Sequence, residues 1–213
     1  MSETLLFVIA ALTAFLFSGV NPAIILSKLI YHRDIRQEGS GNPGFTNFRR
    51  VFGNRYAWFV FALDILKSVV FCAVFGALFG KFYGHYQLGV AFTGFFAMLG
   101  HCFPIWYHLK GGKGFLVYVG MIWMIDWRVG LAATAIFLIF LFTIKYMSLA
   151  SITLAAVSPI ILFIAGADSN KVIFLCALSS VLMIFRHKAN IRRLINHTES
   201  RFTVRSGKKA EQS

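Results

Sequence analysis

The chain has 213 residues, of which 58% are hydrophobic and 16% aromatic, and its mean hydropathy is +0.70. A single soluble core of this size cannot bury so much apolar surface, so the composition excludes a soluble globular domain and predicts an integral membrane protein. The formal net charge of +13 would suggest a nucleic-acid partner in a soluble domain. In a membrane chain the charge is interpreted from its position relative to the apolar segments, so no nucleic-acid partner is predicted.

Three cysteines, Cys72, Cys102 and Cys176, all lie in apolar sequence and show no CxxC spacing. Because their number is odd and their spacing fits no zinc or redox motif, we expect neither a disulfide framework nor a metal site. No cofactor is predicted.

Seven apolar runs follow one another along the chain, and each is predicted to form a membrane helix. They cover residues 5–27, 57–80, 87–106, 114–127, 129–145, 149–166 and 171–186. The first run follows an uncharged and acidic start, which favours a retained helix over a cleaved signal peptide. Several runs are shorter than the roughly 20 residues that span a ~30 Å hydrocarbon core, so some must be kinked or partly re-entrant. The predicted fold class is an all-α integral membrane protein with seven transmembrane helices.

The basic residues indicate how these helices are oriented. If the first helix ends inside, the inner segments collect 17 of the 21 Lys and Arg residues, and the outer segments hold only three. This asymmetry predicts that the N-terminus is outside and the C-terminus is cytoplasmic, by the positive-inside rule. All glycine-rich and basic motifs then share the cytoplasmic face.

The first inner loop contains the sequence GSGNPGFTNFRR at residues 39–50. Its glycines and proline exclude a helix over residues 39–44 and predict a turn-rich backbone. The loop then offers neutral donors and two arginines, which suit a phosphate group: Ser40, Asn42, Thr46, Asn47, Arg49 and Arg50. A solvated connecting loop with positive-inside arginines is the alternative, but it does not explain the density of glycine and asparagine.

Asp64 and Lys67 are the only carboxylate and ammonium well inside an apolar run. Each costs about 2.5 to 3.5 kcal/mol at a helix centre on insertion scales, and the i, i+3 spacing puts both on one helix face, where they can pair. A buried structural ion pair and a direct catalytic role remain equal alternatives for these two residues.

Residues 100–114, GHCFPIWYHLKGGKG, place two lysines among three glycines at the end of an apolar run. Backbone N–H groups of Gly111, Gly112 and Gly114, together with the charges of Lys110 and Lys113, predict a phosphate cradle at the membrane surface. A flexible helix connection is the alternative interpretation of the glycines. His101, on the preceding helix, is a candidate base or a packing histidine.

The C-terminal third adds two polar segments. In KYMSLAS, Ser148 and Ser151 lie on one helix face, and we expect them to pack between helices unless the other motifs converge there. In RHKANIRRLINHTE, His187 and Asn190 are spaced i, i+3 within a segment that also suits an amphipathic helix on anionic lipid. Residues 1–200 are predicted to form one membrane domain, and residues 201–213 a basic, disordered cytoplasmic tail.

Three of these segments, GSGNPGFTNFRR, GHCFPIWYHLKGGKG and RHKANIRRLINHTE, in this order, resemble the cytoplasmic motifs of the bacterial membrane-embedded acyl-phosphate:glycerol-3-phosphate acyltransferases. Asp64 and Lys67 in DILK and the serines of SLAS also look like that family's pattern, so the resemblance covers nearly the whole chain. It implies seven helices in a bacterial cytoplasmic (inner) membrane and transfer of a fatty acyl group from acyl phosphate to position 1 of sn-glycerol 3-phosphate. The products are lysophosphatidic acid and phosphate.

The resemblance also implies a set of site residues. Glycerol 3-phosphate is assigned to Ser40, Arg50, Lys110, Gly111, Gly112, Lys113, His187 and Asn190, with Asn42, Thr46 and Asn47 close by. Proton removal is left open between His101, His187 and an oxygen of a substrate phosphate. Membrane lipid is an expected partner, and the resemblance leaves room for a soluble enzyme that supplies acyl phosphate.

Five positions depart from the family pattern: Phe45, Ser68, Leu109, Val117 and His197. Phe45 stands where a small residue is usual, and its bulk is expected to fall within the loop of residues 39–50. Because the charged residues are intact, the acyltransferase activity is retained as the prediction. The alternatives are a paralogue with another donor or acceptor, a small transporter of an organic phosphate, and a non-catalytic membrane anchor.

Overall fold

The computed structural model describes residues 2–203, which form helices joined by short loops. Each predicted apolar run is mainly helical. Five segments are long and apolar enough to cross a membrane: Glu3–Tyr31, Ala57–Tyr83, Tyr86–Tyr107, Trp127–Ile144 and Met147–Ala165. A sixth is formed if the bent pair Asn170–Arg186 and Lys188–Ile195 is taken as one span. The chain is therefore an all-helical, multi-pass membrane protein.

The elements follow in the order α1 (Glu3–Ser18), α2 (Pro22–Tyr31), η1 (Ile35–Gln37), α3 (Phe45–Phe52), α4 (Ala57–Tyr83), α5 (Tyr86–Cys102), η2 (Ile105–Tyr107), α6 (Phe115–Ile125), α7 (Trp127–Ile144), α8 (Met147–Ala165), α9 (Asn170–Arg186) and α10 (Lys188–Ile195). The run predicted at residues 5–27 is thus two helices with a break at residues 19–21. The predicted run at 171–186 ends in a 57° bend before α10.

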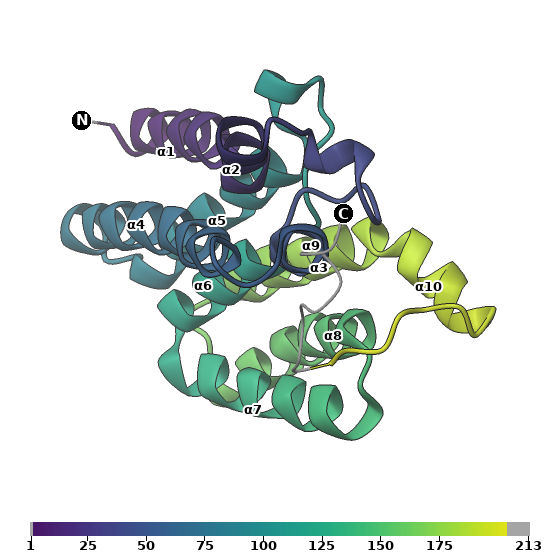
Figure 1. The fold of residues 1–213 in the computed structure, drawn as a ribbon. Helices are drawn as coiled ribbons and strands as arrows, with labels where there is room; N and C mark the ends of the chain where they lie inside the picture. Colours follow the sequence, from purple (N-terminus) through teal and green to yellow (C-terminus); the bar gives the residue numbers. More distant parts are fainter. Residues whose placement is uncertain (1, 204–213) are drawn as a thin grey trace, which may run out of the picture.

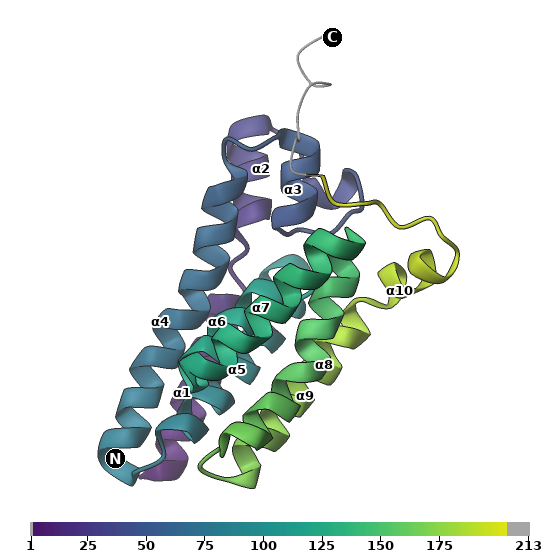
Figure 2. The ribbon, with the colours of Figure 1, turned by 90° about the horizontal axis from the view of Figure 1, so that it is seen from below.

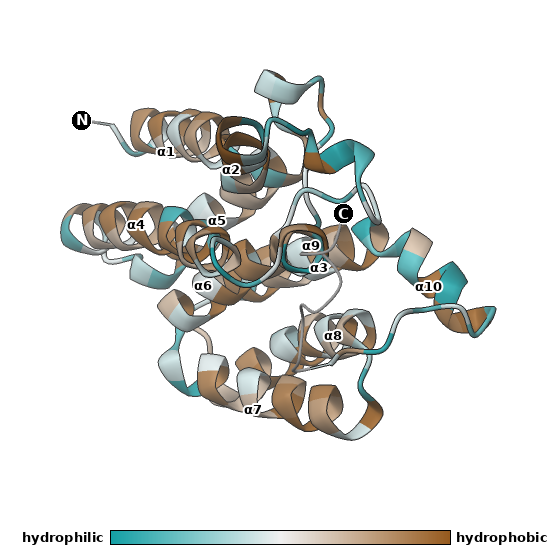
Figure 3. Ribbon diagram, viewed as in Figure 1, coloured by the Kyte–Doolittle hydropathy of each residue, from teal (hydrophilic) through white to brown (hydrophobic). Residues whose placement is uncertain are grey.

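The long helices lie side by side as one bundle, with the N-terminus at one end and α2, α3 and α10 at the other (Figures 1 and 2). The loops that carry the predicted motifs gather at the second end, which we call the loop end. In Figure 3 the loop before α3 and much of α10 are hydrophilic, whereas α1, α4, α7 and α8 are mainly hydrophobic. Polar and apolar sequence are therefore separated along the length of the bundle.

The largest apolar core is formed mainly by side chains of helices α4 to α9. Met98, Tyr118 and Leu154 are among its fully buried side chains. Large apolar side chains also face outward, among them Phe163 at 68% and Ile164 at 77% exposure. Such outward-facing apolar residues are costly in water but favourable against lipid tails. The outer surface therefore supports the membrane assignment made from composition.

Two helices differ from a simple span in length. At about 1.5 Å per residue, the 27 residues of α4 reach roughly 40 Å, which exceeds a ~30 Å hydrocarbon core. The 11 residues of α6 reach only about 16 Å, so α6 is too short to cross alone. Most of its side chains are buried between neighbouring helices, which place its N-terminus near the loop end.

Two local expectations change. Phe45 is the first residue of α3, and the centroid of its ring lies 5.3 Å from those of Trp58 and of Phe61 on α4. Its bulk therefore lies against α4 and outside the loop. Residues 201–203, assigned to the tail, contact the bundle: the backbone N–H of Phe202 donates to the Lys145 carbonyl at 2.6 Å. The rest of the predicted tail lies outside the described residues.

Candidate active site

The loop end contains a pocket of about 290 Å³ that joins three parts of the chain distant in sequence. Its lining comes from η1 and the first loop (residues 39–50), from the glycine-rich loop, and from the end of α9: Arg36, Gly41, Leu109, Lys110, Gly111 and Arg186. Among residues 2–203, three cations and no carboxylate line this pocket, so it suits an anion.

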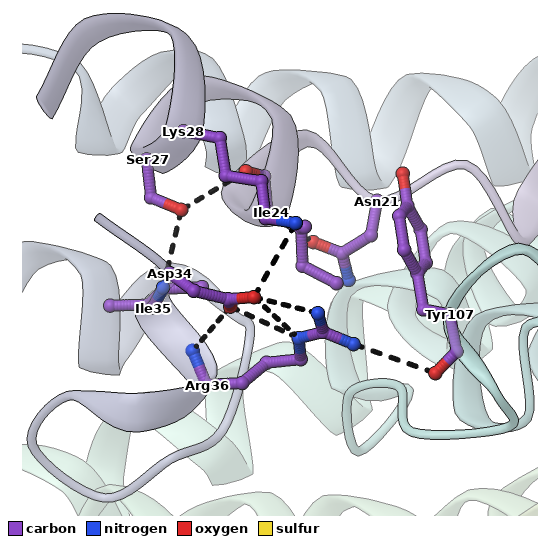
Figure 4. Close-up of polar contacts among 8 residues, drawn as sticks. All are labelled: Asn21, Ile24, Ser27, Lys28, Asp34, Ile35, Arg36 and Tyr107. Atoms are coloured by element: carbon purple, nitrogen blue, oxygen red, sulfur yellow. Dashed lines mark hydrogen bonds and ion pairs between the residues drawn. The ribbon is translucent and has the colours of Figure 1, made fainter. Parts of the chain in front are cut away.

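Arg36 is held in place by the segment before the first loop (Figure 4). Its guanidinium makes a fork with the Asp34 carboxylate, with contacts of 2.6 to 3.2 Å, and it reaches towards the Tyr107 carbonyl at 3.5 Å. Hydrogen bonds from Arg36 hold the pKa of Asp34 at about 2, against the burial that raises it. Asp34 therefore stays ionised and fixes the direction of Arg36 between the two loops.

The glycine-rich loop is clamped from α9. The Arg186 side chain donates to the carbonyls of Gly111 at 2.9 Å and Gly112 at 3.1 Å. The backbone N–H of Gly112 donates to the His101 carbonyl at 3.1 Å, so it is not exposed as the phosphate-cradle prediction assumed. A Cβ atom at Gly112 would overlap the His101 ring, and Gly114 has φ = +83°. These glycines are required by close packing and backbone conformation, which the sequence pattern alone did not distinguish from phosphate binding.

Lys113 points away from this clamp into a second polar cluster. Its ammonium donates to the side-chain oxygen of Asn190, and the Asn190 amide donates to Glu199 at 2.7 Å. Arg193 and Ser148 also donate to the Glu199 carboxylate, both at 2.7 Å. We call these five residues the Lys113 cluster. It joins the glycine-rich loop to α8, α10 and the segment after α10.

Burial lowers the pKa of Lys113 to about 8, with further lowering by Arg193, Arg50 and Arg186 and an opposing effect from Glu199. Four cations thus face one carboxylate in this region. An ammonium whose pKa is lowered by its cationic neighbours gains most when an anion binds among them. The electrostatics of the Lys113 cluster therefore favour a phosphate or carboxylate ligand.

Asp64, Lys67 and His101 form a buried triad behind the glycine-rich loop. The predicted ion pair is present, with 2.8 Å between Lys67 Nζ and Asp64 Oδ1, and Lys67 Nζ is 2.9 Å from His101 Nδ1. His101 is only 5% exposed and packs under Gly111 and Gly112. The geometry is that of a support beneath the loop, since the His101 ring packs against Gly112 and is not part of the pocket lining.

The first loop is organised by Asn47. Its side-chain oxygen accepts from the Ser40 N–H at 2.9 Å, and its amide donates to the Glu38 carbonyl at 2.9 Å. Asn47 is 1% exposed, so it shapes the loop instead of meeting a ligand. Thr46 and Arg50 lie in α3, one turn apart, and Asn42 lies beside Gly44 at the start of that helix.

His187 lies at the bend between α9 and α10, where it is 3% exposed. Its Nδ1 is 2.8 Å from the Met183 carbonyl, which makes Nδ1 the donor and leaves Nε2 as the acceptor of the neutral ring. The backbone N–H of Asn190 donates to the His187 carbonyl at 2.8 Å, so the bend also fixes Asn190. The predicted pair His187 and Asn190 is brought together by this bend.

Several site residues were missed by sequence reasoning. In the sequence Arg186 contributes only to the positive-inside asymmetry, and Glu199 is not among the predicted site residues. Ser148 is expected to pack between helices unless the other motifs converge there, and its hydrogen bond to Glu199 shows that they do. The signal for Glu199 was available, because it is the only carboxylate in a strongly basic segment. Within residues 2–203, no group of three or more His, Cys, Asp or Glu side chains is placed to hold a metal ion.

A multi-pass helical membrane protein with two adjoining clusters of cations at one end belongs to the class that handles anionic substrates at a membrane surface. The family model described as glycerol-3-phosphate acyltransferase matches residues 8–197. The chain therefore belongs to the glycerol-3-phosphate acyltransferase family and is an integral membrane acyltransferase.

Individual relatives agree with this assignment over nearly the whole chain. Glycerol-3-phosphate acyltransferase of Thermoanaerobacter pseudethanolicus is 36% identical over 197 residues, covering 91% of this chain and 94% of the relative. That of Aquifex aeolicus is 35% identical, covering 89% and 95%. The crystal structure of PlsY (YgiH), an integral membrane glycerol 3-phosphate acyltransferase in its glycerol 3-phosphate form, is similar with a TM-score of 0.84. It is 34% identical and covers 92% of this chain and 96% of that one.

Proposed function

We propose that this protein transfers a fatty acyl group from acyl phosphate to position 1 of sn-glycerol 3-phosphate, giving lysophosphatidic acid and phosphate. The observation that carries the proposal is the meeting of cations from separate segments at the loop end of the bundle, Lys113 with Arg50 and Arg193 beside the pocket of Arg36 and Lys110. Family membership supports the acceptor. PlsY structures in a glycerol 3-phosphate form and a lysophosphatidic acid form support acceptor and product.

The choice of donor is supported by the chemistry of the side chains present. An acyl phosphate is a mixed anhydride and is already activated, so no enzyme nucleophile is needed. The three cysteines are buried in apolar sequence, and none of them lines the pocket. The position-1 oxygen of the acceptor attacks the acyl carbon, the bond from that carbon to the phosphate oxygen breaks, and phosphate leaves with the electron pair. The acceptor proton passes to His187 Nε2 or to a phosphate oxygen.

The main barrier to this reaction is electrostatic, because two phosphates must approach each other. Two unit charges at ~4 Å repel by about 4 kcal/mol at an effective dielectric of ~20. The two cationic clusters suit the two phosphate groups, and the cations also stabilise the oxyanion that develops on the acyl group. In this proposal Ser40, Asn42, Thr46, Arg50, Lys110, Gly111, Lys113, His187 and Asn190 contact or surround the substrates. Asp64, Lys67 and His101 hold the loop in position behind them.

We further propose that the chain crosses the membrane seven times, with the loop end in the cytoplasm. The seven segments are the five long spans, the bent pair of α9 and α10, and the short helix α6. The 17 basic residues of the predicted inner segments support this orientation. Acyl phosphate then arrives from the lipid side or from a soluble enzyme, and the site lies in a bacterial inner membrane facing the cytoplasm. A single membrane domain over residues 1–200 is part of the same proposal.

The test uses purified protein, labelled glycerol 3-phosphate and three donors in parallel: palmitoyl phosphate, palmitoyl-CoA and palmitoyl acyl carrier protein. Of the three donors, only palmitoyl phosphate is expected to give product, with lysophosphatidic acid and inorganic phosphate in equal amounts. Product from a thioester donor only would contradict the proposed donor while leaving acylation of glycerol 3-phosphate in place. Absence of product from every donor with folded protein would overturn the proposed reaction and lead to uptake assays in liposomes.

A further inference from the structure

The first membrane segment is broken between α1 and α2, inside the predicted run of residues 5–27. Asn21 begins α2: its side-chain oxygen accepts from the Ile24 N–H at 3.0 Å, and Pro22 occupies the first helical position. Such a break leaves backbone carbonyls at the end of α1 and within residues 19–21 without helical partners. At membrane depth freed carbonyls need other donors, because lipid supplies none.

Two of these carbonyls are satisfied by side chains from other parts of the chain. The carbonyl of Leu16 accepts from the Trp106 indole at 2.8 Å, and the carbonyl of Val20 accepts from Lys67 Nζ at 3.3 Å. The break is also closely packed, since a Cβ atom at Gly100 of α5 would overlap the Phe15 carbonyl. The break is therefore a fixed point in the bundle.

Asn21 adds a third connection. Its amide donates to the Pro43 carbonyl at 3.0 Å, and Asn21 is 1% exposed. Pro43 is buried within the turn-rich stretch of residues 39–44, which includes Ser40 and the pocket residue Gly41. The side chain of Asn21 thus uses its oxygen to start α2 and its nitrogen to hold the first loop.

Each residue that bonds to the break lies in, next to, or behind one of the two loops proposed to bind substrate, the first loop and the glycine-rich loop. Trp106 precedes the glycine-rich loop by a few residues, and Lys67 contacts His101, on which Gly112 packs. Pro43 belongs to the first loop itself. A kink that served only the shape of the first helix would need partners near its own carbonyls, but it would not need the amide bond to Pro43.

We propose that the break between α1 and α2 fixes the position of the first loop, residues 39–50, relative to the glycine-rich loop. In this proposal Asn21 is a positioning residue that acts on the first loop through Pro43. This inference rests on the proposed function, because the loops are taken to hold glycerol 3-phosphate between them. A residue that positions a binding loop mainly affects how tightly the substrate binds and how it is oriented.

The test is Asn21→Ser. Serine is an equally good N-cap, so α2 keeps its start, but its side chain is too short to reach the Pro43 carbonyl. The matched control is Asp126→Ser, which alters the N-cap of α7 away from the loop end. We expect KM for glycerol 3-phosphate to rise about tenfold in Asn21→Ser, equivalent to about 1.4 kcal/mol, with kcat little changed. The control is expected to keep the KM of the unmodified protein.

A second measurement separates this inference from the proposed reaction. Hydrogen exchange of a peptide covering residues 39–52 is expected to become faster in Asn21→Ser and to stay unchanged in Asp126→Ser, whether or not the protein acylates glycerol 3-phosphate. If Asn21→Ser fails to fold, Asn21→Asp replaces it, since aspartate keeps the cap but cannot donate. Unchanged exchange in residues 39–52, or an unchanged KM in an active protein, would overturn the positioning role and leave Asn21 as a helix cap.

Discussion

The two ends of the bundle each carry a pocket edged by an arginine, and they differ in how many cations line it. Away from the loop end, where α5 and α7 begin, a pocket of about 490 Å³ is lined by Tyr86, Trp123, Met124, Ile125, Asp126, Trp127 and Arg128. There Arg128 is paired with Asp126 at 2.6 Å. At the loop end a smaller pocket has three cations in its lining, with the Lys113 cluster nearby.

Arg36 and Arg128 are each paired with a carboxylate at 2.6 Å, so the loop end is distinguished, more than by volume, by the further cations Lys110 and Arg186 in its pocket. A paired arginine beside tryptophans is typical of a membrane interface, where aromatic rings prefer the headgroup region. Cations drawn from separate loops repel one another in the free protein, and an anionic ligand relieves this repulsion. The following predictions test whether function depends on that difference.

The largest effect is expected from Lys113→Met. Removing the ammonium leaves the substrate phosphate without a partly buried cation, and loss of one such donor costs about 100- to 1000-fold in rate. Steady-state kinetics with palmitoyl phosphate and glycerol 3-phosphate measure kcat/KM. Lys171→Met, at the start of α9, is the matched control and should retain full activity. Equal activity of the two variants would refute the role of the Lys113 cluster.

The pH dependence should report Lys113 directly. Because the pKa of Lys113 is lowered to about 8, its ammonium loses the proton as the pH rises through that value, and the attraction for phosphate is lost. We expect kcat/KM for glycerol 3-phosphate to fall above about pH 8, since this ratio follows the free enzyme. In Lys113→Arg the fall should move to higher pH, because guanidinium stays charged. A descending limb at the same pH in both proteins would assign it to another group.

A smaller effect is expected from Glu199→Gln, measured as thermal stability. Burial raises the pKa of Glu199, but hydrogen bonds from Ser148, Asn190 and Arg193 outweigh it and lower the pKa below 4.5. The carboxylate therefore stabilises the fold above its unfolded pKa, and this contribution is lost as the pH falls through the folded value.

Breaking these bonds should cost about 1–3 kcal/mol at pH 7, and the difference in Tm from the unmodified protein should shrink below about pH 4. Glu38→Gln, which alters the exposed pair with Arg33, is the control and should cost less than about 1 kcal/mol. A difference in Tm that stays constant down to pH 3 would show that the charge of Glu199 is not what stabilises the cluster.

The smallest effect is expected from Phe45→Ala. Loss of the ring contacts with Trp58 and Phe61 should lower stability by about 0.5–1.5 kcal/mol. KM for both substrates should stay unchanged, because the ring lies against α4. Phe45→Leu is the control for apolar packing. A change of donor or acceptor preference in Phe45→Ala would show that this residue reaches the site after all.

Much of the architecture could be predicted from sequence because it depends on local patterns. Apolar runs predict the long helices, and the spacing of Asp64 and Lys67 predicts their ion pair. The break in the first run also had a local signal, Asn21 before Pro22, which typically starts a helix. That signal was missed because the run was judged by its hydrophobicity alone.

The contacts that assemble the site could not be predicted in the same way. Arg186 meets the glycine-rich loop, and Glu199 meets Ser148, across more than 50 positions of sequence. Such pairings depend on how helices pack, which residue types and spacings do not encode locally. For the same reason, the glycines of residues 100–114 predict a phosphate cradle but do not reveal that Gly112 packs against His101.

The most direct test is calorimetric titration of glycerol 3-phosphate into the unmodified protein, Lys113→Met and Arg128→Met, with glycerol as the ligand that lacks phosphate. We expect glycerol 3-phosphate to bind the unmodified protein and Arg128→Met, and not to bind Lys113→Met, and we expect no binding of glycerol. Binding retained in Lys113→Met and lost in Arg128→Met would place the phosphate at the opposite end of the bundle and contradict the account.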